Sequence, residues 1–167
     1  MKIQLASSSD ECLRTEALAV VTPVPRDLMI VIEDMTRYMT MCNAVGVAAP
    51  QFGVPFRVFV ARLIVTSGTS GRNVDHSNVV MVNPVVVAEE GSQTGYEGCL
   101  SFPGIQARVS RPQKIEVTWD NVDGERYQGY FTGDNARVIM HEYDHLRGIV
   151  FLDHIKGFKQ FTQRDTR

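Results

Sequence analysis

The chain has 167 residues, 44% hydrophobic and 22% charged, which is the balance of a globular protein. Its formal net charge of −2 gives no reason to expect binding to nucleic acid or to an anionic membrane. Three scattered cysteines cannot build a disulfide framework and favour a reducing compartment. The first twenty residues lack a long apolar core, and no uncharged apolar run reaches spanning length. We therefore expect residues 1–167 to form a single cytoplasmic domain.

A first long helix is predicted over residues 24–42. Apolar side chains recur there on one helix face, and prolines stand near its start, where they are tolerated. The face consists of Leu28, Ile32, Met35 and Met39, and the prolines are Pro23 and Pro25. We interpret the methionines of this stretch as core filling rather than as a binding surface. They are Met29, Met35, Met39 and Met41.

The chain between residues 56 and 131 is typical of β-structure. Phe56–Val65 and Val79–Ala88 are rich in β-branched residues and are predicted to be strands. The polar segment Ser67–Asn78 between them contains two glycines and is predicted to be a loop.

Two further strands are predicted to pair as a hairpin. Lys114–Trp119 alternates, so that Ile115, Val117 and Trp119 share one side of a strand. Arg126–Phe131 can pair back with it across Asn121–Gly124, a turn-like stretch that contains Asp123 and Gly124.

A final helix is predicted from about Asp134 to Arg147, with Asp134 or Gly133 as its cap and Gly148 as its stop. Helices before and after a block of strands indicate an α+β fold. We expect antiparallel strands to pack around this C-terminal helix, together with the long N-terminal helix.

The C-terminal helix carries the sequence His141-Glu142-Tyr143-Asp144-His145, which fits HExxH. Residues four apart lie on one helix face, so both imidazoles can reach one metal ion, and Glu142 can act on a water held there. Isolated HExxH matches often arise by chance. Here the motif follows apolar helix positions and should face the interior, and three of the four histidines fall between 141 and 154, which favours a metal site.

A catalytic metal normally has three protein ligands, so a third must be found. The longer metzincin pattern fails at Phe151, where it needs a histidine, and no glutamate follows Glu142. The best upstream candidate is Cys99, which lies between glycine-bearing turns at Gly95 and Gly104. From the residues alone, Cys99 is equally well a metal ligand or a small buried hydrophobe, whereas Cys12 and Cys42 are interpreted as the latter.

Three segments together resemble the three motifs of the peptide deformylases, in the same order. Residues 46–51 (GVAAPQ) resemble the first motif, residues 97–101 (EGCLS) match the second, and residues 141–145 (HEYDH) match the third. The resemblance extends from about residue 10 to about residue 155, and EGCLSFPG is similar to the bacterial and plastid branch. It implies an enzyme that removes the formyl group from the N-terminal formyl-methionine of newly synthesised polypeptides and releases formate.

The resemblance also implies the roles of individual residues. Cys99, His141 and His145 would bind one divalent metal, generally Fe(II), with Ni(II), Co(II) or Zn(II) able to substitute. Glu142 would move the proton. The Gln51 amide and the Leu100 backbone N–H would donate to the formyl oxygen. Substrate would be held by backbone around the first and second motifs and by an apolar wall, at Val45, Gly46, Gly98 and Val138.

Two contacts outside the motifs are also expected. Glu97 would orient His141, and Arg111 would pair with Asp144. The sequence departs from the family pattern at Ala44, where glycine is usual, and at Asp134 and Asn135, where large apolar residues are usual. The rim of the methionine pocket should therefore be more polar or more open. The segment Ile155–Phe161 should form one or two helical turns at most, which would weaken docking to the ribosome.

Two alternative functions remain open at this point. One is a zinc protease that uses HExxH, although no downstream third ligand stands at a familiar spacing. The other is a metal-free binding module that keeps the fold, although Glu142, Gln51 and all three candidate ligands are intact.

Overall fold

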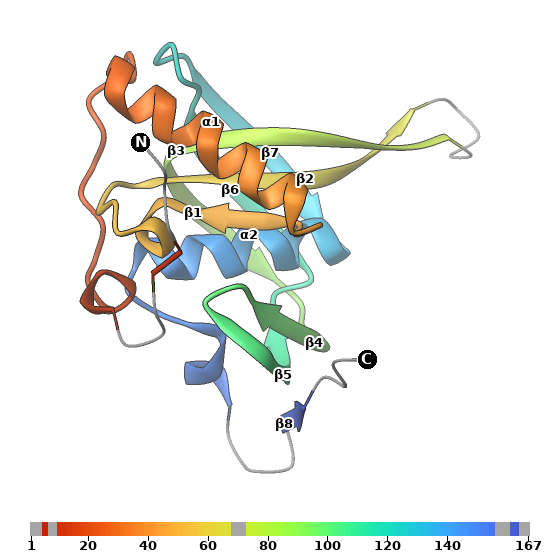
Figure 1. Cartoon of the computed structure of the whole chain (residues 1–167). Helices are drawn as coiled ribbons and strands as arrows, with labels where there is room; N and C mark the ends of the chain where they lie inside the picture. The colour runs from red at the N-terminus through yellow and green to blue at the C-terminus, as the bar shows by residue number, and fades with distance from the viewer. Residues whose placement is uncertain (1–4, 7–9, 68–72, 156–160, 164–167) are drawn as a thin grey trace.

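The computed structural model describes residues 5–6, 10–67, 73–155 and 161–163. Two sheets and two α-helices make up the fold, which confirms the predicted α+β class (Figure 1). The five-stranded sheet has the order β1-β2-β3-β6-β7, and the three-stranded sheet has the order β4-β5-β8. Every pairing within these sheets is antiparallel. No helix among the described residues is long and apolar enough to cross a membrane.

The helices and strands follow one another along the chain with these bounds: η1 (Glu11–Arg14), α1 (Arg26–Met41), β1 (Gly46–Ala48), η2 (Ala49–Phe52), β2 (Val58–Ser67), β3 (Asn73–Glu90), β4 (Gln93–Cys99), β5 (Phe102–Arg111), β6 (Lys114–Asp120), β7 (Arg126–Thr132), α2 (Gly133–Leu146), η3 (Phe151–His154) and β8 (Phe161–Gln163).

The alternation of β2 builds a core on each face of the large sheet. Val58 and Val60 pack with the buried face of α1, whereas Phe59 and Ala61 pack with α2. This follows from the period of two in a strand, which sends successive side chains to opposite faces. The other side of helix α2 faces the β4–β5 hairpin, so the helix lies between that hairpin and the large sheet, as Figure 1 shows. A third core cluster joins the small sheet to η3 through Phe102, Ala107, Val109, Val150 and Phe151.

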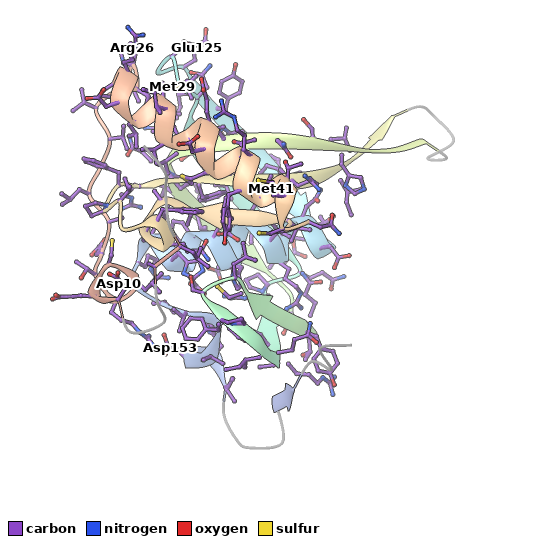
Figure 2. All side chains as sticks on the ribbon, in the orientation of Figure 1. Asp10, Arg26, Met29, Met41, Glu125 and Asp153 are labelled. Carbon is purple, nitrogen blue, oxygen red and sulfur yellow. The ribbon has the colours of Figure 1, made fainter. Side chains whose placement is uncertain are left out.

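Helix α1 begins two residues later than predicted, because Pro25 is its N-cap rather than part of its first turn. The methionine interpretation is confirmed for Met35 and Met39, which are fully buried. It is wrong for Met41, which is 83% exposed at the end of α1 (Figure 2).

The predicted loop at residues 67–78 is largely wrong, because Ser67 ends β2 and Asn73–Asn78 already belong to β3. Residues 68–72 of that loop lie outside the described residues. The β6–β7 hairpin is confirmed, with Ile115 opposite Phe131 and a bond from the Gly124 N–H to the Asn121 carbonyl.

Strands β4 and β5 were not predicted as separate elements. The expected turns at Gly95 and Gly104 are wrong, because both residues lie within these strands and Leu100-Ser101 form the turn between them. Of the expected turns over Ile155–Phe161, residues 156–160 lie outside the described part, and Phe161 begins strand β8 instead.

Helix α2 begins one residue earlier than predicted, and its N-cap is Thr132 rather than Gly133 or Asp134. It ends at Leu146, with Arg147 as its C-cap, one residue before the predicted end. The predicted stop at Gly148 is confirmed, because its φ of 70° is the left-handed conformation that favours glycine. A Cβ atom at Gly148 would stand 2.7 Å from the backbone of Arg14, because the N-terminal segment packs against this end of the helix. Ala17 N–H donates to the Leu146 carbonyl at 2.9 Å in the same contact.

We predict that Gly148→Ala destabilises the protein more than Gly53→Ala does. Both glycines have a φ of 70°, but a Cβ at Gly53 meets nothing within 4 Å. The strained backbone conformation alone costs about 1–2 kcal/mol, and the clash with Arg14 adds about 1–3 kcal/mol at Gly148. Chemical denaturation of both variants measures the difference, and equal losses would contradict the close approach at Arg14.

Candidate metal centre

Cys99, His141 and His145 meet where the end of β4 faces the C-terminal half of α2. Their potential ligand atoms all lie within 4.8 Å of one another, and no other such group of three occurs among the described residues. Cys99 Sγ stands 3.4 Å from His145 Nε2. The two histidines are one helical turn apart, and their ring centroids are separated by 5.1 Å.

The chemistry of these donors fits a transition metal. One thiolate and two imidazoles are ligands that Fe(II), Zn(II) and related ions accept, and three ligands leave a position open. His145 is fully buried, and its Nδ1 atom has no hydrogen-bond partner among the described residues. Burial, reinforced by the charge of His141, lowers the pKa of His145 and keeps its ring neutral, as a metal ligand requires.

Glu97 is the carboxylate that fixes the orientation of His141. Its Oε2 atom lies 2.9 Å from His141 Nδ1, so that Nδ1 donates and Nε2 is the nitrogen left for a metal, which would have to displace any proton there. Burial alone would raise the pKa of Glu97, but hydrogen bonds from His141 and Arg111 outweigh it and lower the pKa well below its ordinary range. The expected contact between Glu97 and His141 is therefore present.

Arg111 connects Glu97 to the far side of the helix. It donates to both oxygens of Glu97 at 2.9 Å, and its Nη1 donates to Asp144 Oδ2 at 2.5 Å, which is the expected pair. The sequence did not indicate two further members of this network. Arg137 donates to Glu97 at 2.8 Å, and His154 lies 2.7 Å from Asp144. The position of Arg137, one turn before His141, was the signal that could have revealed it.

The side chain of Gln51 is held in one orientation. Its Oε1 atom accepts from the Ala48 backbone N–H at 2.9 Å, so its amide nitrogen must face the other way. That nitrogen donates to Cys99 Sγ and to Ser101 Oγ, each at 3.3 Å. Gln51 is only 2% exposed, and a donor is thereby fixed beside the candidate metal ligands.

Glu142 differs from Glu97 in having no partner to hold its charge. It is 4% exposed, and its Oε2 atom is buried without a hydrogen bond from any described residue. Burial raises the pKa of Glu142 to about 7, with the charge of His141 opposing the rise. A carboxyl group in this range can both accept and give up a proton near neutral pH.

A cleft of about 500 Å³ opens onto these residues. Cys99, His141 and Glu142 line it, whereas His145 lies behind them. The other residues expected from the sequence to meet substrate all line the same cleft: Val45, Gly46, Gln51, Gly98, Leu100 and Val138.

Of the residues that depart from the family pattern, Ala44 lines this cleft itself, whereas Asp134 and Asn135 lie beside it. A second hollow shares Val45, Arg137 and Val138 with it, and Asp134 and Asn135 line that hollow. Asn135 binds the backbone of Ile64 through both ends of its amide, at 2.8 Å and 2.9 Å. Its polar group is thereby used within the fold, whereas Asp134 is exposed.

One cysteine and two histidines beside an unpaired carboxyl group, on an α+β scaffold and open to a cleft, are features typical of a metal-dependent hydrolase. The polypeptide deformylase family matches residues 3–161, and this chain belongs to that family. Its enzymes depend on a metal and remove the N-formyl group from newly synthesised polypeptides. The cluster of Cys99, His141 and His145 agrees with that dependence.

Individual relatives agree with this assignment along nearly the whole chain. Peptide deformylase 1 of Clostridium perfringens is 37% identical over 150 residues, which are 90% of this chain and 95% of that protein. The crystal structure of the Thermotoga maritima peptide deformylase has a TM-score of 0.81 at 32% identity, covering 94% of this chain and 99% of that one. A Met-Ala-Ser-bound peptide deformylase from Acinetobacter baumannii has a TM-score of 0.81 at 30% identity, covering 93% and 99%.

We predict that Glu97→Gln weakens metal binding by about 10–100-fold, because such partners orient the ligand histidine and raise its basicity. The amide keeps the size of the side chain but cannot accept from His141 and both arginines at once. Competition with a metal chelator measures the affinity, with Glu116→Gln on the exposed side of β6 as the control. An unchanged affinity in Glu97→Gln would show that His141 is oriented without Glu97.

Proposed function

We propose that this chain hydrolyses the formamide bond of N-terminal formyl-methionine through one divalent metal held by Cys99, His141 and His145. The observation that carries this proposal is the convergence of Cys99 with the two histidines beside Glu142 at the floor of a cleft. Membership of the deformylase family supports the choice of substrate. Formate release from a formyl-methionyl peptide tests it directly.

A divalent metal held by Cys99, His141 and His145 would supply a Lewis acid that lowers the pKa of water at the site. Glu142 accepts a proton from that water while the water oxygen forms a bond with the formyl carbon. Glu142 then delivers the proton to the amine nitrogen as the carbon–nitrogen bond breaks. The products are formate and a free N-terminal amine. The raised pKa of Glu142, about 7, suits both transfers.

Negative charge grows on the formyl oxygen as the water oxygen adds to the formyl carbon. We assign its stabilisation to the Gln51 amide nitrogen and to the Leu100 backbone N–H. Support for Gln51 comes from its fixed amide, whose nitrogen already faces Cys99 at 3.3 Å. Support for Leu100 comes from its place in the turn directly after Cys99 and from its position in the lining of the same cleft.

The substrate backbone is proposed to add as a strand along the outer edge of β1. Arg62 N–H donates to the Val45 carbonyl at 2.8 Å, so the backbone groups of Val45 point towards β2. Alternation then directs the N–H and carbonyl of Gly46 away from β2. Strand β1 is the first strand of its sheet, and Gly98 lines the opposite wall of the cleft. Between these walls an extended peptide can bind by main-chain hydrogen bonds.

The methionine side chain is proposed to lie against Val45 and Val138. The adjoining hollow, reached past the same two residues, makes the far end of this pocket open and partly polar, since Asp134 and Arg137 line it. The polar or open rim expected from the sequence agrees with this arrangement.

We further propose that the enzyme acts in the cytoplasm, on chains emerging from the ribosome. The support is the substrate itself, because formyl-methionine begins new chains. Cell fractionation and co-sedimentation with ribosomes test this location.

We predict that Glu142→Gln keeps the metal but loses turnover. The amide preserves size and reach yet cannot accept the proton, and such transfers contribute about 10²–10⁴-fold to rate. The turnover number should fall at least about 100-fold with little change in KM, whereas His145→Ala should lose both metal and activity. Steady-state deformylation and metal analysis of both variants separate chemistry from coordination. Near-normal turnover in metal-loaded Glu142→Gln would require another group to move the proton.

Two rival functions are tested in the same assays. A zinc protease would cleave unformylated peptides, and a metal-free binding module would contain no metal and release no formate. The intact set of ligands, base and amide donor favours the deformylase over both.

We propose Fe(II) as the metal in the cell, with Ni(II), Co(II) and Zn(II) able to replace it, because the Cys-His-His donor set accepts all of them. A thiolate beside Fe(II) in an open cleft should be oxidised in air. We therefore predict that the Fe(II) form loses activity in air while the Ni(II) form persists. Residual activity against time of exposure measures this, and equal decay of the two forms would contradict it.

A further inference from the structure

Gly46 lies directly against the carboxylate of Glu142. A Cβ atom built on Gly46 would stand 2.3 Å from Glu142 Oε1, 2.7 Å from its Cδ and 2.8 Å from its Cγ. Real Cβ atoms essentially never approach other atoms this closely. The outer half of the Glu142 side chain therefore occupies the space that any side chain at Gly46 would need.

The backbone conformation does not itself demand glycine here. Six glycines of the described chain have a positive φ, and Gly46 is not among them. An L-amino acid could therefore adopt the same backbone shape at this position. What excludes a side chain is the position of Glu142.

Packing against Gly46 is also what locates the carboxylate. The Oε2 atom of Glu142 is buried and has no hydrogen-bond partner among the described residues. The strand cannot move away to make room. Val47 and Ala48, which follow in β1, are fully buried, and Gly46 pairs with fully buried Ala61 on β2. An added methyl group would therefore have to displace Glu142.

We propose that Gly46 is a positioning residue for Glu142, and that its missing side chain sets where the proton-transferring carboxylate lies. The proposal rests on the proposed role of Glu142 as the base. It is separate from the main-chain contact proposed between Gly46 and substrate, because side chains project from the faces of a strand while N–H and carbonyl groups project from its edges.

The first test is the kinetics of Gly46→Ala. A displacement of about 1 Å can cost about 100-fold in rate. We therefore expect the turnover number to fall about 100-fold, with KM changed by less than about threefold and one metal retained per chain. A normal turnover number would overturn the proposal. So would a large rise in KM at unchanged turnover, because the methyl group would then act on substrate rather than on Glu142.

The second test needs no activity. Gly46→Ala is introduced into three backgrounds: the natural Glu142, Glu142→Gln and Glu142→Ala. In each background, the melting temperature is measured with and without Gly46→Ala. The glutamine fills the same space as glutamate, so Gly46→Ala should lower the melting temperature in the first two backgrounds. The alanine removes the atoms at 2.3–2.8 Å, so the loss should disappear in the third.

An equal loss in all three backgrounds would mean that the methyl group disturbs β1 itself, and would overturn the proposal. If Gly46→Ala does not fold alone, folding in the Glu142→Ala background supports the steric account, and failure there overturns it. The proposed role of Glu142 as the base fails separately, through normal turnover in Glu142→Gln alone, and the proposed function fails if the natural chain releases no formate from a formyl-methionyl peptide. The melting temperatures would in that case still show whether Gly46 and Glu142 compete for one space.

Discussion

The buried carboxylate of Glu97 is the interaction on which the site depends. It accepts hydrogen bonds from Arg111 on β5 and from Arg137 and His141 on α2, at 2.8–2.9 Å. Glu97 itself lies on β4, so this one group ties the small sheet to the helix. Because residues two apart share a face of a strand, the face that presents Glu97 to α2 also presents Cys99 to it. The meeting of Cys99 with the histidines is thus a geometric consequence of the Glu97 network.

The same arrangement divides two carboxylates into opposite roles. Glu97 is surrounded by cations and stays ionised, and removing one partner from such a buried network typically costs about 3–5 kcal/mol. Glu142 is one residue along the helix from His141, its Oε2 atom is buried without a hydrogen bond from any described residue, and its pKa is raised. Positively charged partners surround Glu97, which supports a candidate metal ligand, and none forms a hydrogen bond with the Oε2 atom of Glu142, which is proposed to move protons. Environments that give two neighbouring carboxyl groups such different pKa values are typical of acid–base sites.

The sequence predicted correctly those elements in which apolar residues recur at the spacing of a helix or a strand. The face of α1, the β6–β7 hairpin and the HEYDH helix all have regular apolar spacing, and the structure has each of them. Strand β4 was not predicted, because the residues that it directs towards α2 are not the apolar ones by which a strand is recognised. Gln93 binds the Gly133 carbonyl at 2.7 Å, Gly95 leaves room for Arg137, and Glu97 and Cys99 serve the site. A strand that faces its helix with polar groups lacks the apolar alternation by which strands are recognised.

Asp134 and Asn135 show how local stability and the shape of the pocket are linked. Strand β1 covers the edge of β2 only as far as Gly46, so Ile64 further along would expose an unpaired backbone edge. Asn135 satisfies both backbone groups of Ile64 and so acts in place of a neighbouring strand residue. An apolar side chain at position 135 could not do this. The first turn of α2 is therefore polar because it closes a sheet edge. The hollow lined by Asp134 and Asn135, beside the proposed methionine pocket, follows from that structural requirement.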